Sequence, residues 1–199
     1  MRTFMLRARK GPTSERFHVL RRCGPHHLDV LCSTIVNAIS LSLRLRTDTI
    51  IHVVCEGAPQ QPVCITFDTR YVQHIIPDEE GVAKELQYAL QKNKHLSLGT
   101  LIDIKPGITL HKISFERLVE QYQNNAYYLH PQGQDIRDIP TDDMQDGVFI
   151  LGDYIGLPKK TEQLLDRRGV KRLTVGPHML YANHCVVLVH NELDRREVN

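Results

Sequence analysis

VFILGDYIG at residues 148–156 and LTVGP at residues 173–177 each join an apolar strand to a loop that contains glycine. Only a short predicted helix separates the two strands in the sequence. Parallel α/β proteins build their nucleotide sites at the carboxyl ends of such strands. These residues therefore predict a ligand site of that kind in the last third of the chain.

Neither loop has a phosphate-binding pattern, because G-x-G-x-x-G and G-x-x-x-x-G-K-[ST] are both missing. The loops instead favour a nucleoside ligand that carries no phosphate, and S-adenosylmethionine is the natural candidate. Gly152 and Gly176 would let the main chain approach such a ligand, since glycine has no Cβ. The alternative is that these glycines only end their strands.

The composition predicts one domain that covers residues 1–199 and buries a substantial core. A net charge of +2 and a pI of about 8.3 permit a polyanionic partner on a local patch only. The five cysteines are an odd number in mostly apolar surroundings, which favours reduced thiols in a cytosolic protein. We expect a cytoplasmic location and no membrane span, because the sequence has neither an apolar signal region nor a run of membrane-spanning length.

Hydrophobic periodicity predicts alternating strands and helices. Strands are expected at residues 4–9, 49–55, 63–67, 108–113, 126–129, 148–151 and 173–175, and helices at 28–43, 78–92, 115–122 and 180–194. Residues 94–105 are expected to be a connecting loop, and the first strand should carry a cationic outer face. This rhythm predicts a three-layer α/β domain with a largely parallel sheet.

The segment from Val186 to Val189 allows two interpretations. Four aliphatic residues in succession favour a strand by propensity. The surrounding residues instead separate into a polar and an apolar helical face, so we expect a helix.

Five motifs in fixed order resemble the TrmY family of SPOUT methyltransferases. They are LDVLC at 28–32, YYLH at 127–130, FILGDYIG at 149–156, LTVGP at 173–177, and ANHC at 182–185 with HNELD at 190–194. The archaeal members of that family methylate N1 of a pseudouridine in the T-arm of transfer RNA. The resemblance spans nearly the whole chain and implies the same reaction here.

The resemblance also implies a C-terminal trefoil knot, a homodimer and a division of labour within the domain. Residues 126–199 would form the knotted half that binds S-adenosylmethionine, and residues 1–125 would shape the RNA side. The implied cofactor-binding residues are Leu129, Leu151, Gly152, Leu173, Val175, Gly176, Leu180 and Cys185.

Cys185 has several possible roles. A catalytic nucleophile would need an activating neighbour, and His184 points elsewhere on a helix. A zinc site with His178, His184 and His190 lacks paired ligand spacing, so no metal is expected. The family pattern favours a wall of the cofactor pocket, and a plain core thiol is the alternative.

Asp29 is the candidate catalytic base, because N1 of pseudouridine carries a proton that must leave. An aspartate near the start of a helix is equally common as a cap or dipole partner. His26 and His27 would assist it or lie in a solvated loop. The sequence departs from archaeal relatives at Tyr154, where those proteins often carry histidine.

Arg7, Arg9 and Lys10 are the candidate RNA-binding residues, with Arg21 and Arg22 as possible additions. Phosphate contacts of this kind position a nucleic acid without reading its sequence. The alternative is a solvated charged face. Two rival functions stay open, namely methylation of another base or ribose in ribosomal or transfer RNA, and a cofactor-binding module without turnover.

Overall fold

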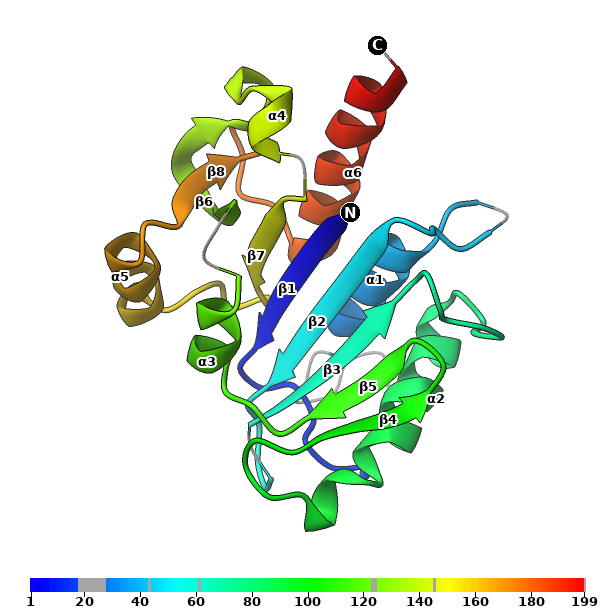
Figure 1. Cartoon of the computed structure of the whole chain (residues 1–199). Helices are drawn as coiled ribbons and strands as arrows, with labels where there is room; N and C mark the ends of the chain where they lie inside the picture. The colour runs from blue at the N-terminus through cyan, green and yellow to red at the C-terminus, as the bar shows by residue number, and fades with distance from the viewer. Residues whose placement is uncertain (18–27, 43, 61, 123–124, 145, 199) are drawn as a thin grey trace.

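A single eight-stranded sheet organises the computed structural model, which describes residues 1–17, 28–42, 44–60, 62–122, 125–144 and 146–198 (Figure 1). The strands are β1 (Arg2–Ala8), β2 (Thr49–Cys55), β3 (Val63–Asp68), β4 (Leu101–Lys105), β5 (Ile108–His111), β6 (Ala126–Asp135), β7 (Val148–Gly152) and β8 (Lys171–Thr174). The helices are α1 (Leu28–Ile39), α2 (Glu79–Leu90), α3 (Phe115–Glu120), α4 (Thr141–Met144), α5 (Lys159–Arg167) and α6 (Ala182–Val198).

The sheet is mixed, in the order β4-β5-β3-β2-β1-β7-β6-β8. All neighbours from β2 to β8 in that order run parallel, whereas β3, β5 and β4 add to β2 in antiparallel pairs. The predicted largely parallel sheet is therefore right for one half of the fold and wrong for the other. Short connections explain the antiparallel pairs β2–β3 and β4–β5, because residues 56–62 and 106–107 are too short to cross over to a parallel strand.

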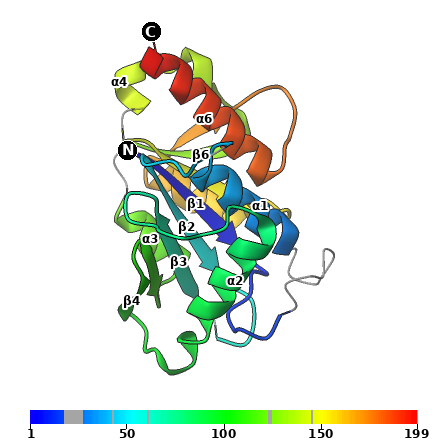
Figure 2. The same ribbon diagram turned by 90° about the vertical axis from the view of Figure 1, so that its right-hand side faces the viewer.

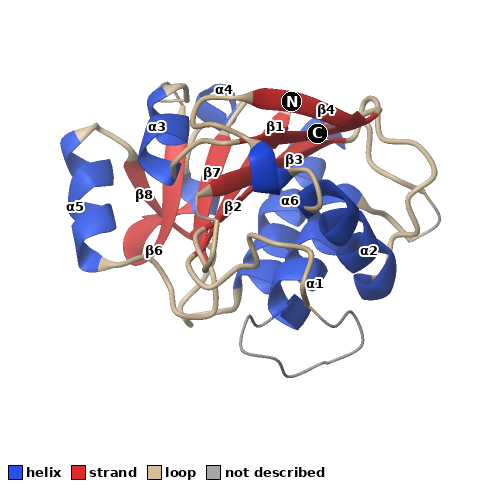
Figure 3. Ribbon diagram, turned by 90° about the horizontal axis from the view of Figure 1, so that it is seen from below, coloured by secondary structure: helices blue, strands red, loops and turns tan. Residues whose placement is uncertain are grey.

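Helices cover both faces of the sheet, which confirms the three-layer α/β arrangement (Figure 3). One buried cluster joins the sheet to α1, α2 and α6, which lie side by side (Figure 2). A second cluster joins the opposite face to α3 and α5. The parallel half of the sheet thus lies between two apolar layers, and its strand ends are left to build a site.

β1 occupies the centre of the sheet, between β2 and β7. Phe4 and Leu6 are buried under α1, while Met5 is buried on the side of α3 and α5. The exposed cationic face expected for this strand is therefore wrong. Arg7 lies on a covered face, and the exposed basic residues follow the strand at Arg9 and Lys10.

Two other expectations have clear outcomes. Residues 94–105 are not simply a loop, since they contain a 3-10 turn at Asn93–His95 and the edge strand β4. β4 resembles a loop in sequence because its side chains are partly or largely exposed. The expected helix over Val186 to Val189 is confirmed by α6. Among the described residues, no helix is long and apolar enough to cross a membrane.

Candidate functional site

The carboxyl ends of β6, β7 and β8 meet at a cavity of about 680 Å³, which we call the glycine-loop pocket. Three segments line it, residues 129–131, 151–157 and 173–185 in part, together with Glu162 of α5. Of the predicted cofactor-binding residues, the pocket wall contains Leu129, Leu151, Gly152, Leu173, Val175, Leu180 and Cys185. Its size and its largely apolar wall are typical of a small-molecule site.

Gly152 is required by the loop that follows it. A Cβ at this position would lie 2.5 Å from the backbone carbon of Gly156 and 2.6 Å from the nitrogen of Leu157. The loop therefore folds back directly over the end of β7. The glycine permits a close approach of the loop's own backbone, which in turn shapes the pocket.

Asp153 fastens this loop to the end of β1. Its carboxylate accepts hydrogen bonds from the backbone nitrogens of Arg9 at 2.8 Å and Ile155 at 2.9 Å. Its own backbone nitrogen donates to the carbonyl oxygen of Arg7 at 3.1 Å. The pocket loop and the basic residues after β1 are thus held in one fixed arrangement.

Gly176 lies outside the pocket wall, although its neighbour Val175 lines the pocket. Its φ of +152° falls in a region that only glycine adopts without strain. Thr174 Oγ1 donates a hydrogen bond to the carbonyl oxygen of Gly176 at 2.8 Å. Gly176 therefore shapes the turn after β8.

The segment after Leu129 forms the remaining wall. Leu129 and Gln134 both align with Leu173 of β8, so residues 130–133 bulge out of the strand between them. A Cβ on Gly133 would lie 2.4 Å from the carbonyl carbon of Leu173. The bulge is consequently closed against β8, and it presents His130 to the pocket.

Cys185 lies in the pocket wall and is only 6% exposed. Burial raises the pKa of its thiol to about 11, so the thiol is protonated at neutral pH. A reactive thiolate requires the opposite shift. His184 instead packs its ring edge-on against Tyr181, with 6.1 Å between ring centres. The geometry therefore fits a wall residue better than a nucleophile.

The four described cysteines are all free and buried, which confirms the expected core thiols. Cys23 lies outside the described residues.

The charge of the glycine-loop pocket is negative. No lysine or arginine occurs among the described residues that line it, whereas Asp153 and Glu162 contribute carboxylates. A phosphate-bearing nucleotide would be repelled by this set, and a ligand with net positive charge would be attracted.

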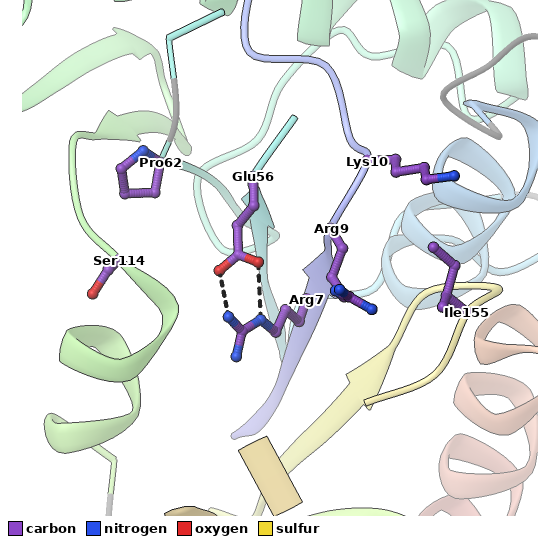
Figure 4. A pocket seen from close by; sticks show the side chains of 7 residues that line it. All are labelled: Arg7, Arg9, Lys10, Glu56, Pro62, Ser114 and Ile155. Atoms are coloured by element: carbon purple, nitrogen blue, oxygen red, sulfur yellow. Dashed lines mark hydrogen bonds and ion pairs between the residues drawn. The ribbon is translucent and has the colours of Figure 1, made fainter. Parts of the chain in front are cut away.

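A second opening of about 690 Å³ is here called the basic cavity. It is lined by Arg7, Arg9, Lys10, Glu56, Pro62, Ser114 and Ile155 (Figure 4). Ile155 also lines the glycine-loop pocket, so the two openings are adjacent. The structure therefore brings the three predicted RNA-binding residues together next to the predicted cofactor site.

Arg7 is held by contacts with several other elements of the fold. Its Nε and Nη2 atoms pair with the Glu56 carboxylate at 3.0 and 2.9 Å (Figure 4). Its Nη1 atom lies 3.0 Å from Glu116 and donates to Thr161 Oγ1 at 2.8 Å. The guanidinium also lies 4.6 Å from the centre of the Phe115 ring. Arg7 thus joins β1 to the end of β2, to α3 and to α5.

Asp29 lies in the first turn of α1. Because α1 links the parallel strands β1 and β2, its amino end lies at the same edge of the sheet as both openings. The side chain lines neither opening. Its Oδ1 atom is buried without a hydrogen-bond partner among the described residues, which is uncommon for a carboxylate. His26, His27, Arg21 and Arg22 lie outside those residues.

A family model described as "Putative SAM-dependent RNA methyltransferase" matches residues 1–198. The chain belongs to this methyltransferase family. Members use S-adenosylmethionine as methyl donor, which agrees with a nucleoside pocket that lacks phosphate-binding residues.

Two relatives and one solved structure illustrate the similarity. The tRNA (pseudouridine(54)-N(1))-methyltransferase of Methanocaldococcus jannaschii is 35% identical, over 100% of this chain and 98% of its own. A "Putative pseudouridine methyltransferase" of Vibrio vulnificus is 34% identical, over 99% and 100%. Nep1 of Archaeoglobus fulgidus, solved with S-adenosylhomocysteine, shares the fold with a TM-score of 0.63 at 10% identity, over 99% and 98%.

The structure adds residues of this methyltransferase that sequence patterns did not single out. Asp153 directly follows a buried strand, and Glu56 follows β2 in the same way, so position after a strand was an available signal. Glu162 had no such signal, since only the packing of α5 turns it toward the pocket.

Proposed function

We propose that the protein transfers a methyl group from S-adenosylmethionine to N1 of a pseudouridine in transfer RNA, in the cytoplasm. The observation that carries this proposal is the adjacency of two openings with opposite charge, which share Ile155. One suits a cationic nucleoside and the other suits a polyanion. The relatives from M. jannaschii and V. vulnificus are named for pseudouridine methylation, which supports the choice of acceptor.

The glycine-loop pocket would hold the cofactor. Its apolar side chains, among them Leu129, Leu151 and Leu173, would provide a slot for a flat adenine ring, and the loops after β7 and β8 would offer backbone groups at the edge of the slot. When bound, S-adenosylmethionine supplies a methyl group already activated by its sulfonium. The protein's contribution is then to align the acceptor with that methyl group and to exclude water.

Asp29 is proposed to accept the proton from N1 of the acceptor. Its buried, unpartnered Oδ1 atom at the amino end of α1 supports this role, because an incoming N–H group would satisfy it. A positioned general base contributes about 10²–10⁴-fold to the rate.

Arg9 and Lys10 are proposed to contact RNA phosphates, because both are exposed at the mouth of the basic cavity. Arg7 would act differently, since two carboxylates already neutralise its guanidinium. Its role would be to hold the cavity walls in place.

The knot, the homodimer and the division of the domain are also proposed. The wall of the glycine-loop pocket comes from residues 129–185, and all but Ile155 of the basic cavity comes from the first 125 residues, which supports a cofactor half and an RNA half. The knotted path is proposed from the resemblance to the SPOUT methyltransferases. Met179 and Tyr181, 83% and 57% exposed beside the pocket, support a subunit contact there.

The test is methyl transfer from labelled S-adenosylmethionine to two transfer RNA transcripts, one of which carries pseudouridine in the T-arm. We expect label only in the pseudouridine-containing transcript, recovered as N1-methylpseudouridine. Label in another nucleoside would support RNA methyltransferase activity and refute pseudouridine as the acceptor. Cofactor binding without transfer to any RNA would refute the proposed reaction.

A further inference from the structure

Glu162 differs from the other carboxylate of the glycine-loop pocket. Asp153 uses both oxygens in hydrogen bonds to backbone nitrogens. Across the part of the chain that the structure describes, the Glu162 carboxylate has neither a hydrogen bond nor an ion pair, although it lines the pocket and is half-buried. It is therefore a negative charge available to a ligand.

The position of Glu162 is fixed by its helix. Thr161 and Leu165 bury one side of α5, and the Thr161 hydroxyl accepts the 2.8 Å hydrogen bond from Arg7. Near the other end of α5, Asp166 accepts a 2.7 Å hydrogen bond from the hydroxyl of Tyr128 in β6. These contacts fix the rotation of the helix, so Glu162 stays on the side of α5 that lines the pocket.

The chemistry of the methyl donor matches this charge. S-adenosylmethionine carries a sulfonium and an ammonium at its methionine end, and one carboxylate, which gives a net charge of +1 at neutral pH. An unpaired carboxylate stabilises such a ligand electrostatically where the described lining residues include neither lysine nor arginine. The same carboxylate gives no gain to the uncharged nucleoside 5′-methylthioadenosine.

We propose that Glu162 pairs with a positive charge at the methionine end of the cofactor and thereby favours ligands that carry this end over 5′-methylthioadenosine, which lacks it. This inference rests on the glycine-loop pocket being the cofactor site. It assigns Glu162 to recognition of the donor, and it does not depend on which RNA is methylated.

The experiment measures the dissociation constants of S-adenosylmethionine, S-adenosylhomocysteine and 5′-methylthioadenosine by calorimetry, without RNA. Glu162→Gln keeps the size and hydrogen-bonding capacity of the side chain and removes its charge. We expect about tenfold to hundredfold weaker binding of S-adenosylmethionine, as for the loss of a charged hydrogen bond. Binding of 5′-methylthioadenosine should stay within about twofold, because it lacks the charged end.

S-adenosylhomocysteine separates the two sources of charge, since it keeps the ammonium and lacks the sulfonium. If Glu162→Gln weakens the binding of both methionine-containing ligands, Glu162 pairs with the ammonium. If it weakens the binding of S-adenosylmethionine alone, Glu162 pairs with the sulfonium. Unchanged affinity for S-adenosylmethionine, or an equal loss for all three ligands, would overturn the proposal. An equal loss would indicate contact with the shared adenosine part.

Three variants complete the design. Glu162→Asp should retain part of the preference for the charged ligands. Glu80→Gln on α2 removes an exposed charge far along the sheet and should change none of the affinities. Leu129→Trp narrows the pocket and should weaken all three ligands, so an unaffected Leu129→Trp would show that the cofactor site itself is wrong.

Discussion

The glycine-loop pocket and the basic cavity lie side by side, but the residues that line them differ in polarity and in the sign of their charge. The pocket has an apolar wall, two carboxylates and glycine-dependent loops, whereas the cavity has three cations around one carboxylate. This difference corresponds to the two reactants of an RNA methyltransferase, a cationic nucleoside and a polyanion. It indicates that each opening would reject the other's ligand on charge alone.

The largest expected effect comes from Asp29, which lies at the edge shared by the two openings. Asp29→Asn should lower the rate of methyl transfer by about 10²–10⁴-fold, because a general base is lost. Cofactor affinity should not change, since Asp29 lines neither opening. Single-turnover rates and calorimetry check both statements. A variant with an unchanged rate would remove Asp29 from the mechanism.

Gly152→Ala should distort the glycine-loop pocket and leave the basic cavity unchanged. The added Cβ would meet the backbone of Gly156 and Leu157 and displace the loop. A displacement of about 1 Å costs on the order of a hundredfold in rate, and cofactor affinity should fall with it. RNA binding should persist.

Gly99→Ala is the control for this variant. Gly99 has a positive φ of +84°, open space surrounds its Cβ position, and it lines neither opening. It should lose some stability and keep full affinity. Equal cofactor affinity in Gly152→Ala and wild type would show that the loop does not shape the site.

Within the basic cavity, we expect Arg7 to stabilise the fold and Arg9 to bind RNA. Arg7→Ala leaves Glu56 and Glu116 without their cation and should lower the free energy of unfolding by about 2–4 kcal/mol. Arg9→Ala should change stability by less than about 0.5 kcal/mol. It should instead reduce the slope of RNA affinity against salt by about one.

Urea unfolding and RNA titrations at several salt concentrations measure these effects. If Arg7→Ala kept full stability and reduced the salt slope, Arg7 would be a phosphate contact like Arg9.

Cys185 should give the smallest effect, confined to the pocket. Cys185→Ala removes one buried sulfur from the wall and should weaken cofactor binding about fivefold, whereas Cys64→Ala, in the opposite core cluster, should not. Because burial raises the pKa of Cys185 to about 11, its thiolate fraction stays low up to about pH 9, so alkylation should be slow there. Rapid alkylation at pH 7 would contradict the wall assignment.

The sequence predicted best where periodicity and buried strands dominate. β7, α5, β8 and the convergence of their loops followed from VFILGDYIG and LTVGP, and α6 followed from its apolar face. The antiparallel edge of the sheet was not predicted, because β4 is a half-exposed strand and its charged residues obscure the alternation of apolar and polar side chains. Pairing partners of a strand depend on loop lengths and packing across the whole sheet.

The site was predictable only in part for a similar reason. Arg7 appeared to be a surface cation, because its sequence neighbours cannot show that Glu56 and Glu116 meet it from distant segments. No sequence pattern indicated Glu162, since tertiary contacts alone set the rotation of α5. Residues whose role depends on contacts between elements require the structure.

A crystal structure with S-adenosylhomocysteine and a pseudouridine-containing T-arm stem-loop would locate both reactants at once. We expect the adenosine between Leu129, Leu151 and Leu173, with an RNA phosphate at Arg9 and the acceptor base between the two openings. Adenosine bound elsewhere, or RNA bound away from the basic cavity, would contradict these assignments.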